Sequence, residues 1–268
     1  MLRLASYIAL CTVVVSLSEV SARADDLDSR INLELAFRDS ILEQPAPERF
    51  QPLIREGETT ITFVRDLPET VGKTEFFLKV DWSYDYRYVT QATDGGTQVT
   101  VTPKNVKLTP RLRHVIRMPV AFYHAEVWDS RLLGHEFDHV AVSLDPRPRA
   151  LLVHLCSNLP VYRFSIEGEE TPSDKEMREG INQEIQRRQS AILELLRANY
   201  VALDKVSSHG QSAMQHRREF FASLYTESNL KATKFAYLEE AKAILDSESY
   251  QRLKPIHVSA DPVHSESR

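Results

Sequence analysis

The chain has 268 residues, of which 42% are hydrophobic and 26% are charged, and its formal net charge is −5. This ordinary globular composition excludes a disordered chain, a collagen-like repeat and a coiled coil along the whole length. The mild acidic excess gives no electrostatic footprint for nucleic acid. The 8 glycines include no glycine-rich phosphate loop, so nucleotide or flavin binding is not expected either.

The first 24 residues have the pattern of a secretory signal peptide. Arg3 precedes an apolar run over 7–17, and Ala22-Arg23-Ala24 is a small-x-small cleavage sequence. The competing interpretation is a membrane anchor, but the run is well short of the roughly 20 residues that span a bilayer. Cleavage after Ala24 therefore predicts a secreted or periplasmic protein without a transmembrane segment. Cys156 is then the single cysteine, in apolar surroundings typical of a buried residue.

The mature chain is predicted to be one α+β unit whose first half is rich in strands. Strand signals occur over 60–64, 76–88, 98–102 and 113–118, with a hairpin turn at Asp94-Gly95-Gly96. After Pro119 we expect a helix over 125–144, strands over 150–155 and 159–166, and helices over 174–206, 212–228 and 231–247. The predicted segments are an N-terminal helix (27–43) and linker within 25–57, a main domain at 58–230, a helical extension at 231–257 and a disordered tail at 258–268.

The motif His135-Glu136-x-x-His139 lies in the predicted helix over 125–144. Residues four apart are separated by about 40° around a helix, so both imidazoles can reach one zinc ion. Glu136 projects beside them, where it can deprotonate a water that the metal activates. The motif therefore predicts a zinc site, and the competing interpretation is an incidental surface pair.

The apolar residues of this helix are expected on the side opposite the two histidines. Such a helix would line a cleft, packing one face into the core and presenting His135 and His139 outward with Trp128 and Arg131. The apolar positions are Leu133, Phe137, Val140 and Leu144.

A catalytic zinc usually has three protein ligands and one open position, so a third ligand is needed. Asp145 has the spacing found in some zinc proteases, but Val142 replaces the glycine that would turn the chain back. His154 is flanked by Val153 and Leu155 and is better explained as a core histidine. A glutamate on the next helix is a further alternative, at Glu176, Glu179 or Glu184.

His209 is the preferred third ligand because Gly210 is a natural helix C-cap, which fixes the direction of its neighbour. Asp204 and Ser207 are expected to orient a ligating imidazole or a bound water. On spacing alone, a surface histidine at a helix end is the alternative.

Residues 60–212 resemble a bacterial family of predicted secreted zinc-dependent proteases, catalogued as a domain of unknown function. The resemblance is carried by Trp128, by the H-E-x-x-H motif and by Asp204-x-x-Ser207-x-His209-Gly210. It implies a zincin-like fold: a β-rich part with an aromatic strand, here Trp82-Ser83-Tyr84, then the motif helix and a long helix. Leu203 and Ser207 stand where the family has Tyr and Thr, so Tyr200, one turn earlier, is the candidate substitute for the tyrosine.

These observations predict a zinc-dependent metallopeptidase of the zincin type, with Zn²⁺ held by His135, His139 and His209. Glu136 is the expected general base, and it later returns the proton to the leaving amine. Tyr200 and Arg131 are candidates for stabilising the oxyanion. The expected partner is a protein or peptide substrate, bound by an edge strand of the sheet. The alternative function is a non-enzymatic exported protein with a structural or vestigial metal site that acts as a protein-binding module.

Overall fold

The structure is a computed structural model that describes a few positions between 28 and 43 and the ranges 45–68, 70–119, 127–167 and 171–256. The predicted signal peptide (1–24), the tail (258–268) and most of the predicted helix over 27–43 lie outside the described residues. Within the described residues, no helix combines the length and the apolar character needed to cross a membrane.

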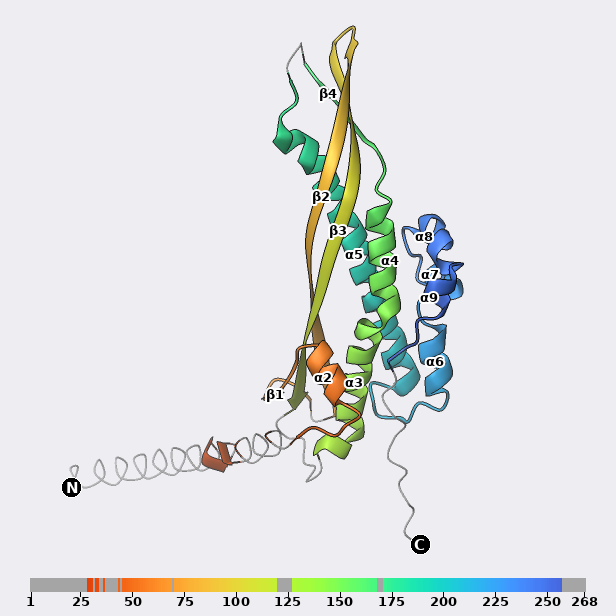
Figure 1. Ribbon diagram of the computed structural model, residues 1–268. Coiled ribbons are helices and arrows are strands. Elements are labelled where there is room, and N and C mark those ends of the chain that lie inside the picture. The colour runs from red at the N-terminus through yellow and green to blue at the C-terminus, as the bar shows by residue number, and fades with distance from the viewer. Residues whose placement is uncertain are drawn as a thin grey trace, which may run out of the picture.

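A long hairpin forms most of the sheet (Figure 1). Strands β2 (Lys73–Thr93) and β3 (Gly96–Pro119) pair antiparallel, joined by the two-residue turn Asp94-Gly95. The strands predicted over 98–102 and 113–118 are therefore parts of the single strand β3.

Two short strands share the other edge of β3. Strand β1 (Thr59–Val64) runs parallel to its C-terminal end, and β4 (Tyr162–Ile166) runs antiparallel to residues 97–101. The sheet is thus dominated by antiparallel pairing, which confirms the predicted mixed α+β class at this level.

Helix α5 (Asp174–Ser207) is the longest helix described and confirms the helix predicted over 174–206. Ser173 accepts from the Glu176 backbone N–H, while the Glu176 carboxylate accepts from the Ser173 backbone. This capping box explains the start of the helix. Its buried stripe includes Ile181, Ile185, Ile192, Leu195, Leu196 and Leu203.

The hairpin runs along α5 (Figure 1). Aromatic side chains that alternate on β2 make the contacts with this helix. Trp82 Nε1 and the Tyr84 hydroxyl both donate to Asn182 Oδ1, at 3.0 and 2.9 Å. The Tyr86 hydroxyl donates to Asp174, the first residue of α5. Residues two apart on a strand share a face, so one row of aromatics can follow the helix.

The motif helix α3 (Arg131–Leu144) is followed directly by α4 (Pro146–Ser157), so the strand predicted over 150–155 is wrong. A short apolar run has the same appearance in a buried helix and in a buried strand. Here Pro146 occupies the first helical position, and the Asp145 side chain caps the helix by accepting from Arg147 N at 2.9 Å.

Helix α3 begins later than the predicted range 125–144, and two short elements pack at its N-terminal end. These are α2 (Gln51–Glu56) and the 3-10 helix η1 (Val127–Asp129). The Phe50 and Phe137 rings stack at 4.2 Å between α2 and α3. This contact anchors the motif helix in the core.

Between residues 212 and 256 the structure describes four short helices, in place of the two predicted over 212–228 and 231–247. Tyr225 and Lys234 have φ values of 58° and 54°, and such left-handed residues interrupt helices. The predicted domain boundary between residues 230 and 231 falls inside α7. The helices are α6 (Arg217–Ser223), α7 (Glu227–Ala232), α8 (Leu238–Leu245) and α9 (Glu248–Gln251).

These helices lie on the side of α4 away from the hairpin (Figure 1). Hydrogen bonds connect them to the junction between α3 and α4. The buried Arg147 forms an ion pair with Asp145 at 2.6 Å and donates to the carbonyl oxygens of Phe221 and Ala222. The Tyr225 hydroxyl donates to Val142 O at 2.7 Å. The C-terminal helices therefore share the core of the motif helix.

Candidate metal centre

The site forms where α3 and α5 pack side by side. The two helices run antiparallel, so residue numbers increase along α3 in the direction in which they decrease along α5. On α3 the facing positions are 135, 139 and 143, which recur every four residues. On α5 they are 207, 204 and 200. Helix α5 thus covers the face of α3 that was predicted to line an open cleft. His135 and His139 are consequently buried, with only 6% and 5% of their surface exposed.

Both imidazoles converge on one carboxylate oxygen. His135 Nε2 and His139 Nε2 lie 3.0 and 2.9 Å from Asp204 Oδ1. Burial raises the pKa of Asp204, but the hydrogen bonds and charge of the two imidazoles outweigh it and hold this pKa well below its usual range. Asp204 is therefore a carboxylate anion, available as a ligand.

These three side chains form a group whose ligand atoms all lie within 4.8 Å of one another, and so could hold a metal ion. In a tetrahedral site with metal–nitrogen distances of about 2.0–2.1 Å, neighbouring ligand atoms are about 3.3 Å apart. The spacings of 2.9 and 3.0 Å to Asp204 Oδ1 are close to this value. Two imidazoles and one carboxylate also suit zinc chemically. The residues present therefore fit the ion that the sequence motif predicts.

The two imidazoles are oriented differently. Ser207 Oγ lies 3.3 Å from His135 Nδ1, in the supporting position predicted for it. His139 Nδ1 is buried and has no hydrogen-bond partner among the described residues. His139 is held instead by the contact of its Nε2 with Asp204 Oδ1 and by packing on Tyr200, whose ring centroid lies 4.4 Å from that of His139.

Glu136 lies between the ligands in sequence and points toward the start of β2. It is 2% exposed, and its Oε2 accepts from the Thr74 hydroxyl at 2.7 Å. Burial raises the pKa of Glu136, while the neighbouring imidazoles and Thr74 oppose that rise. Gly72 packs directly on the carboxylate, where a Cβ atom would lie 2.7 Å from Glu136 Cδ. Sequence reasoning missed Gly72 and Thr74, because no local pattern links them to Glu136, which lies more than 60 residues further along the chain.

His209, the preferred third ligand of the sequence analysis, lies outside the group of three. Its side chain is 68% exposed, and its Nδ1 is 3.8 Å from Asp204 Oδ1. The physical reason is that α5 ends at Ser207, and the left-handed residues Ser208 and His209 take the His209 side chain off the helical face that packs on α3. Asp204 lies on the regular helical face opposite α3, so it takes the third position rather than the supporting role predicted for it.

Tyr200 is buried, and its hydroxyl donates to Ser143 Oγ at 3.1 Å. Ser143 Oγ is also 2.6 Å from His114 Nε2, while His114 Nδ1 lies 2.8 Å from Gly57 O. A carbonyl only accepts, so Nδ1 carries the proton and Nε2 accepts from the serine. The Tyr200 hydroxyl, predicted as a catalytic group, is thus engaged in a buried chain of hydrogen bonds that the sequence did not suggest.

The other predicted alternatives are engaged elsewhere. The Asp145 carboxylate pairs with Arg147, and His154 Nε2 lies 3.3 Å from Glu240 O. Arg131 donates to Gln211 O at 3.0 Å. Glu176 caps α5, and the remaining two glutamates bond within α5: Glu179 to Gln183, and Glu184 to Arg187 and Arg188.

Cys156 is buried, as predicted, and burial raises the pKa of its thiol to about 12. It is therefore a protonated thiol at neutral pH, and it is not a member of the group formed by His135, His139 and Asp204.

A buried ion pair joins the motif helix to the C-terminal helices. Asp138, which directly precedes His139, is bonded through both carboxylate oxygens to Arg217 of α6. Burial raises the pKa of Asp138, and Arg217 opposes that rise. Sequence reasoning missed this pair, because the helix was predicted to have one exposed face, on which an aspartate needs no partner.

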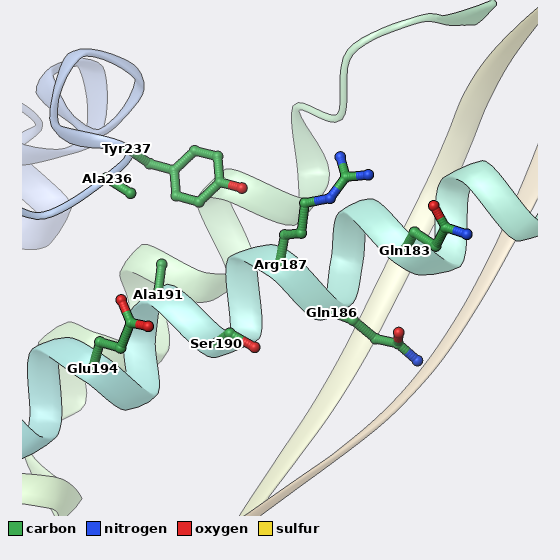
Figure 2. A pocket seen from close by; sticks show the side chains of 8 residues that line it. All are labelled: Gln183, Gln186, Arg187, Ser190, Ala191, Glu194, Ala236 and Tyr237. Atoms are coloured by element: carbon green, nitrogen blue, oxygen red, sulfur yellow. The ribbon is translucent and has the colours of Figure 1, made fainter.

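Two cavities lie away from these residues. One, of about 470 Å³, lies between α5 and Tyr237, and Figure 2 shows the side chains that line it, among them Arg187 and Glu194 on the helix. The other, of about 460 Å³, lies between α4 and the C-terminal helices and is lined by Val153, Ile244 and other mainly apolar residues. Neither includes a member of the metal-binding group.

Comparison with known proteins gives no relative: no protein-family model, no curated protein and no solved structure matches the chain.

Proposed function

We propose that the protein is a zinc-dependent metallopeptidase. The observation that carries the proposal is the convergence of His135, His139 and Asp204 beside the buried carboxylate of Glu136. Three protein ligands and an adjacent carboxylate are the groups that hydrolysis with a metal-activated water requires. The resemblance of the H-E-x-x-H and Asp204-to-Gly210 segments to secreted zinc proteases, and the signal-peptide pattern, support a zincin-like enzyme that acts after export.

In this proposal the two histidines and Asp204 hold the ion. Zinc, when bound, polarises a peptide carbonyl and lowers the pKa of a coordinated water to about 7. Glu136 removes a proton from the attacking water and returns it to the leaving amine. Thr74 fixes the carboxylate by its hydrogen bond to Oε2, and Gly72 leaves room for it. Burial raises the pKa of Glu136, which is the direction that exchange of a proton by a carboxylate at neutral pH requires.

An extended peptide would bind at the edge of β2. Among the described residues, β2 pairs only with β3, so its other edge has no partner strand there. Thr74, at the start of β2, contacts Glu136. A peptide that adds to this edge by main-chain hydrogen bonds would pass next to the proposed base.

The test is metal analysis combined with one conservative substitution. We expect the purified protein to bind one zinc per chain and to cleave an unstructured protein such as casein, and chelation to abolish the cleavage. Glu136→Gln is expected to keep the zinc and to lose the cleavage. Glu179→Gln, on the exposed face of α5, is the matched control and is expected to behave like the wild type. Absence of stoichiometric zinc, or full activity in Glu136→Gln, would refute the proposal.

The second candidate is a structural metal site in a non-enzymatic exported protein. The burial of both histidines and the position of the two cavities elsewhere favour it. In that case zinc is expected to raise the melting temperature equally in the wild type and in Glu136→Gln, and neither protein cleaves any peptide. The two candidates thus differ in the effect of Glu136, not in metal binding.

A further inference from the structure

The chain that leaves α5 has an unusual backbone conformation. Three consecutive residues have left-handed φ values, namely Ser208 at 50°, His209 at 55° and Gly210 at 77°. Only glycine adopts this region freely, so a serine and a histidine in succession there are uncommon. Such conformations persist where the surrounding structure enforces them, and they concentrate at functional sites.

The surroundings of this turn do enforce it. His209 N donates to Asp204 O at 2.9 Å, and Ser212 N donates to Ser207 O at 2.9 Å. Gly210 lies against the His135 ring so closely that a Cβ atom there would lie 2.8 Å from Cγ of that ring. The turn therefore rests directly on one of the proposed ligands, and its position is fixed relative to the metal-binding group.

The His209 imidazole stands at the most open side of this group. The Asp204 side chain is 29% exposed, whereas those of His135 and His139 are 5% and 6% exposed. Solvent, and anything dissolved in it, therefore reaches the group past Asp204. His209 Nδ1 lies 3.8 Å from Asp204 Oδ1, and the side chain is 68% exposed. The strained turn thus places a hydrogen-bonding ring where a bound molecule would enter.

We propose that His209 is a substrate-binding residue, whose ring N–H donates a hydrogen bond to a main-chain carbonyl oxygen of the peptide at the metal centre. This inference rests on the proposed function and names the substrate class as polypeptide backbone. An imidazole N–H is a suitable donor for a carbonyl oxygen, which only accepts. His209 then acts on the peptide and not on the ion, because the ligand positions are filled by His135, His139 and Asp204.

The test measures two affinities in the full chain, with His209→Ala as the variant. His216→Ala is the matched control, since His216 is also exposed and makes no side-chain capping bond. Zinc affinity is measured by competition with a chelator, and binding of a dipeptidyl hydroxamate to the zinc-loaded protein by calorimetry. We expect His209→Ala to keep zinc affinity within threefold and to bind the hydroxamate at least tenfold more weakly. His209→Gln retains an N–H donor and is expected to recover part of that loss.

Three results would contradict the inference. A loss of zinc affinity in His209→Ala of tenfold or more would make His209 a ligand and overturn the inference. Equal hydroxamate binding by His209→Ala and His216→Ala would overturn it too. A wild-type protein that binds no zinc would refute the proposed function and this inference together, so the two failures are distinguishable.

Discussion

Adding one methyl group at Gly72 tests whether the Glu136 carboxylate is the reactive group. A Cβ atom at Gly72 would lie 2.7 Å from both Cγ and Cδ of Glu136, and closer still to Oε1, whereas ordinary contacts begin at 3.4 Å. In Gly72→Ala the side chain must therefore shift by about 0.7 Å or more from the position in which the Thr74 hydroxyl holds it. A displacement of about 1 Å at a reacting group costs on the order of 10²-fold in rate.

We therefore expect Gly72→Ala to lower kcat/KM for peptide cleavage by about 10²-fold. Zinc affinity should be unchanged, because no ligand of the proposed site is touched. Crowding of the packed interior should also lower the unfolding free energy by about 1–3 kcal/mol. The assays are steady-state cleavage of a fluorogenic peptide, zinc competition and urea denaturation.

Gly134→Ala is the matched control, because Gly134 lies next to His135 in the same motif helix and has open space around its Cα. It is expected to keep full activity and to gain about 1 kcal/mol of stability, the usual difference between alanine and glycine within a helix. Undiminished kcat/KM in Gly72→Ala would refute the role assigned to the Glu136 carboxylate. A parallel loss of zinc would show that the methyl group disturbs the whole site.

Three further changes test the ligand, the buried histidine and the ion pair. Asp204→Asn keeps the shape of the side chain but removes its charge, so zinc affinity measured by chelator competition should fall by at least about 10²-fold. Burial lowers the pKa of His114 below the ordinary value of 6.5, so the unfolded chain binds the proton more readily. The unfolding free energy should then decrease as the pH falls below about 6.5, by up to about 1.4 kcal/mol per pH unit, and urea titrations of His114→Gln should lack this component. Arg217→Met leaves Asp138 buried without its partner and should cost about 3–5 kcal/mol, whereas Asp138→Asn combined with Arg217→Met should recover part of it in the same titration.

Each of these expectations has a contrary result. Zinc binding by Asp204→Asn at wild-type strength would exclude this carboxylate as a ligand. A His114→Gln protein with the same pH dependence as the wild type would assign that dependence to other groups. Equal losses in Arg217→Met and in the double variant would mean that Arg217 stabilises the fold through contacts other than Asp138.

Local patterns were sufficient for the elements that carry the site. The helical period identified the motif helix and the long helix over 174–206, which is α5 in the structure. The alternating large residues over 76–88 identified the aromatic part of β2 that packs on α5. Two predictions were wrong, the strand over 150–155 and the two long helices after residue 212, and both errors have local explanations. The run 150–155 is apolar enough for a helix or a strand. After residue 212, the left-handed residues Tyr225 and Lys234 separate α6 from α7 and α7 from α8, and no sequence pattern marks them.

The sequence by itself determined that His135 and His139 share one helical face with Glu136 between them, because a spacing of four residues fixes that geometry within one element. Only the tertiary structure decided which side chain completes the group, since this depends on how α5 packs against α3 and where α5 ends. The packing brings Asp204 to the histidines, while the left-handed turn after Ser207 directs His209 outward. The packing also buries the face of α3 that the sequence analysis predicted to line an open cleft. The helix that covers this face, α5, contributes residues about 70 positions further along the chain.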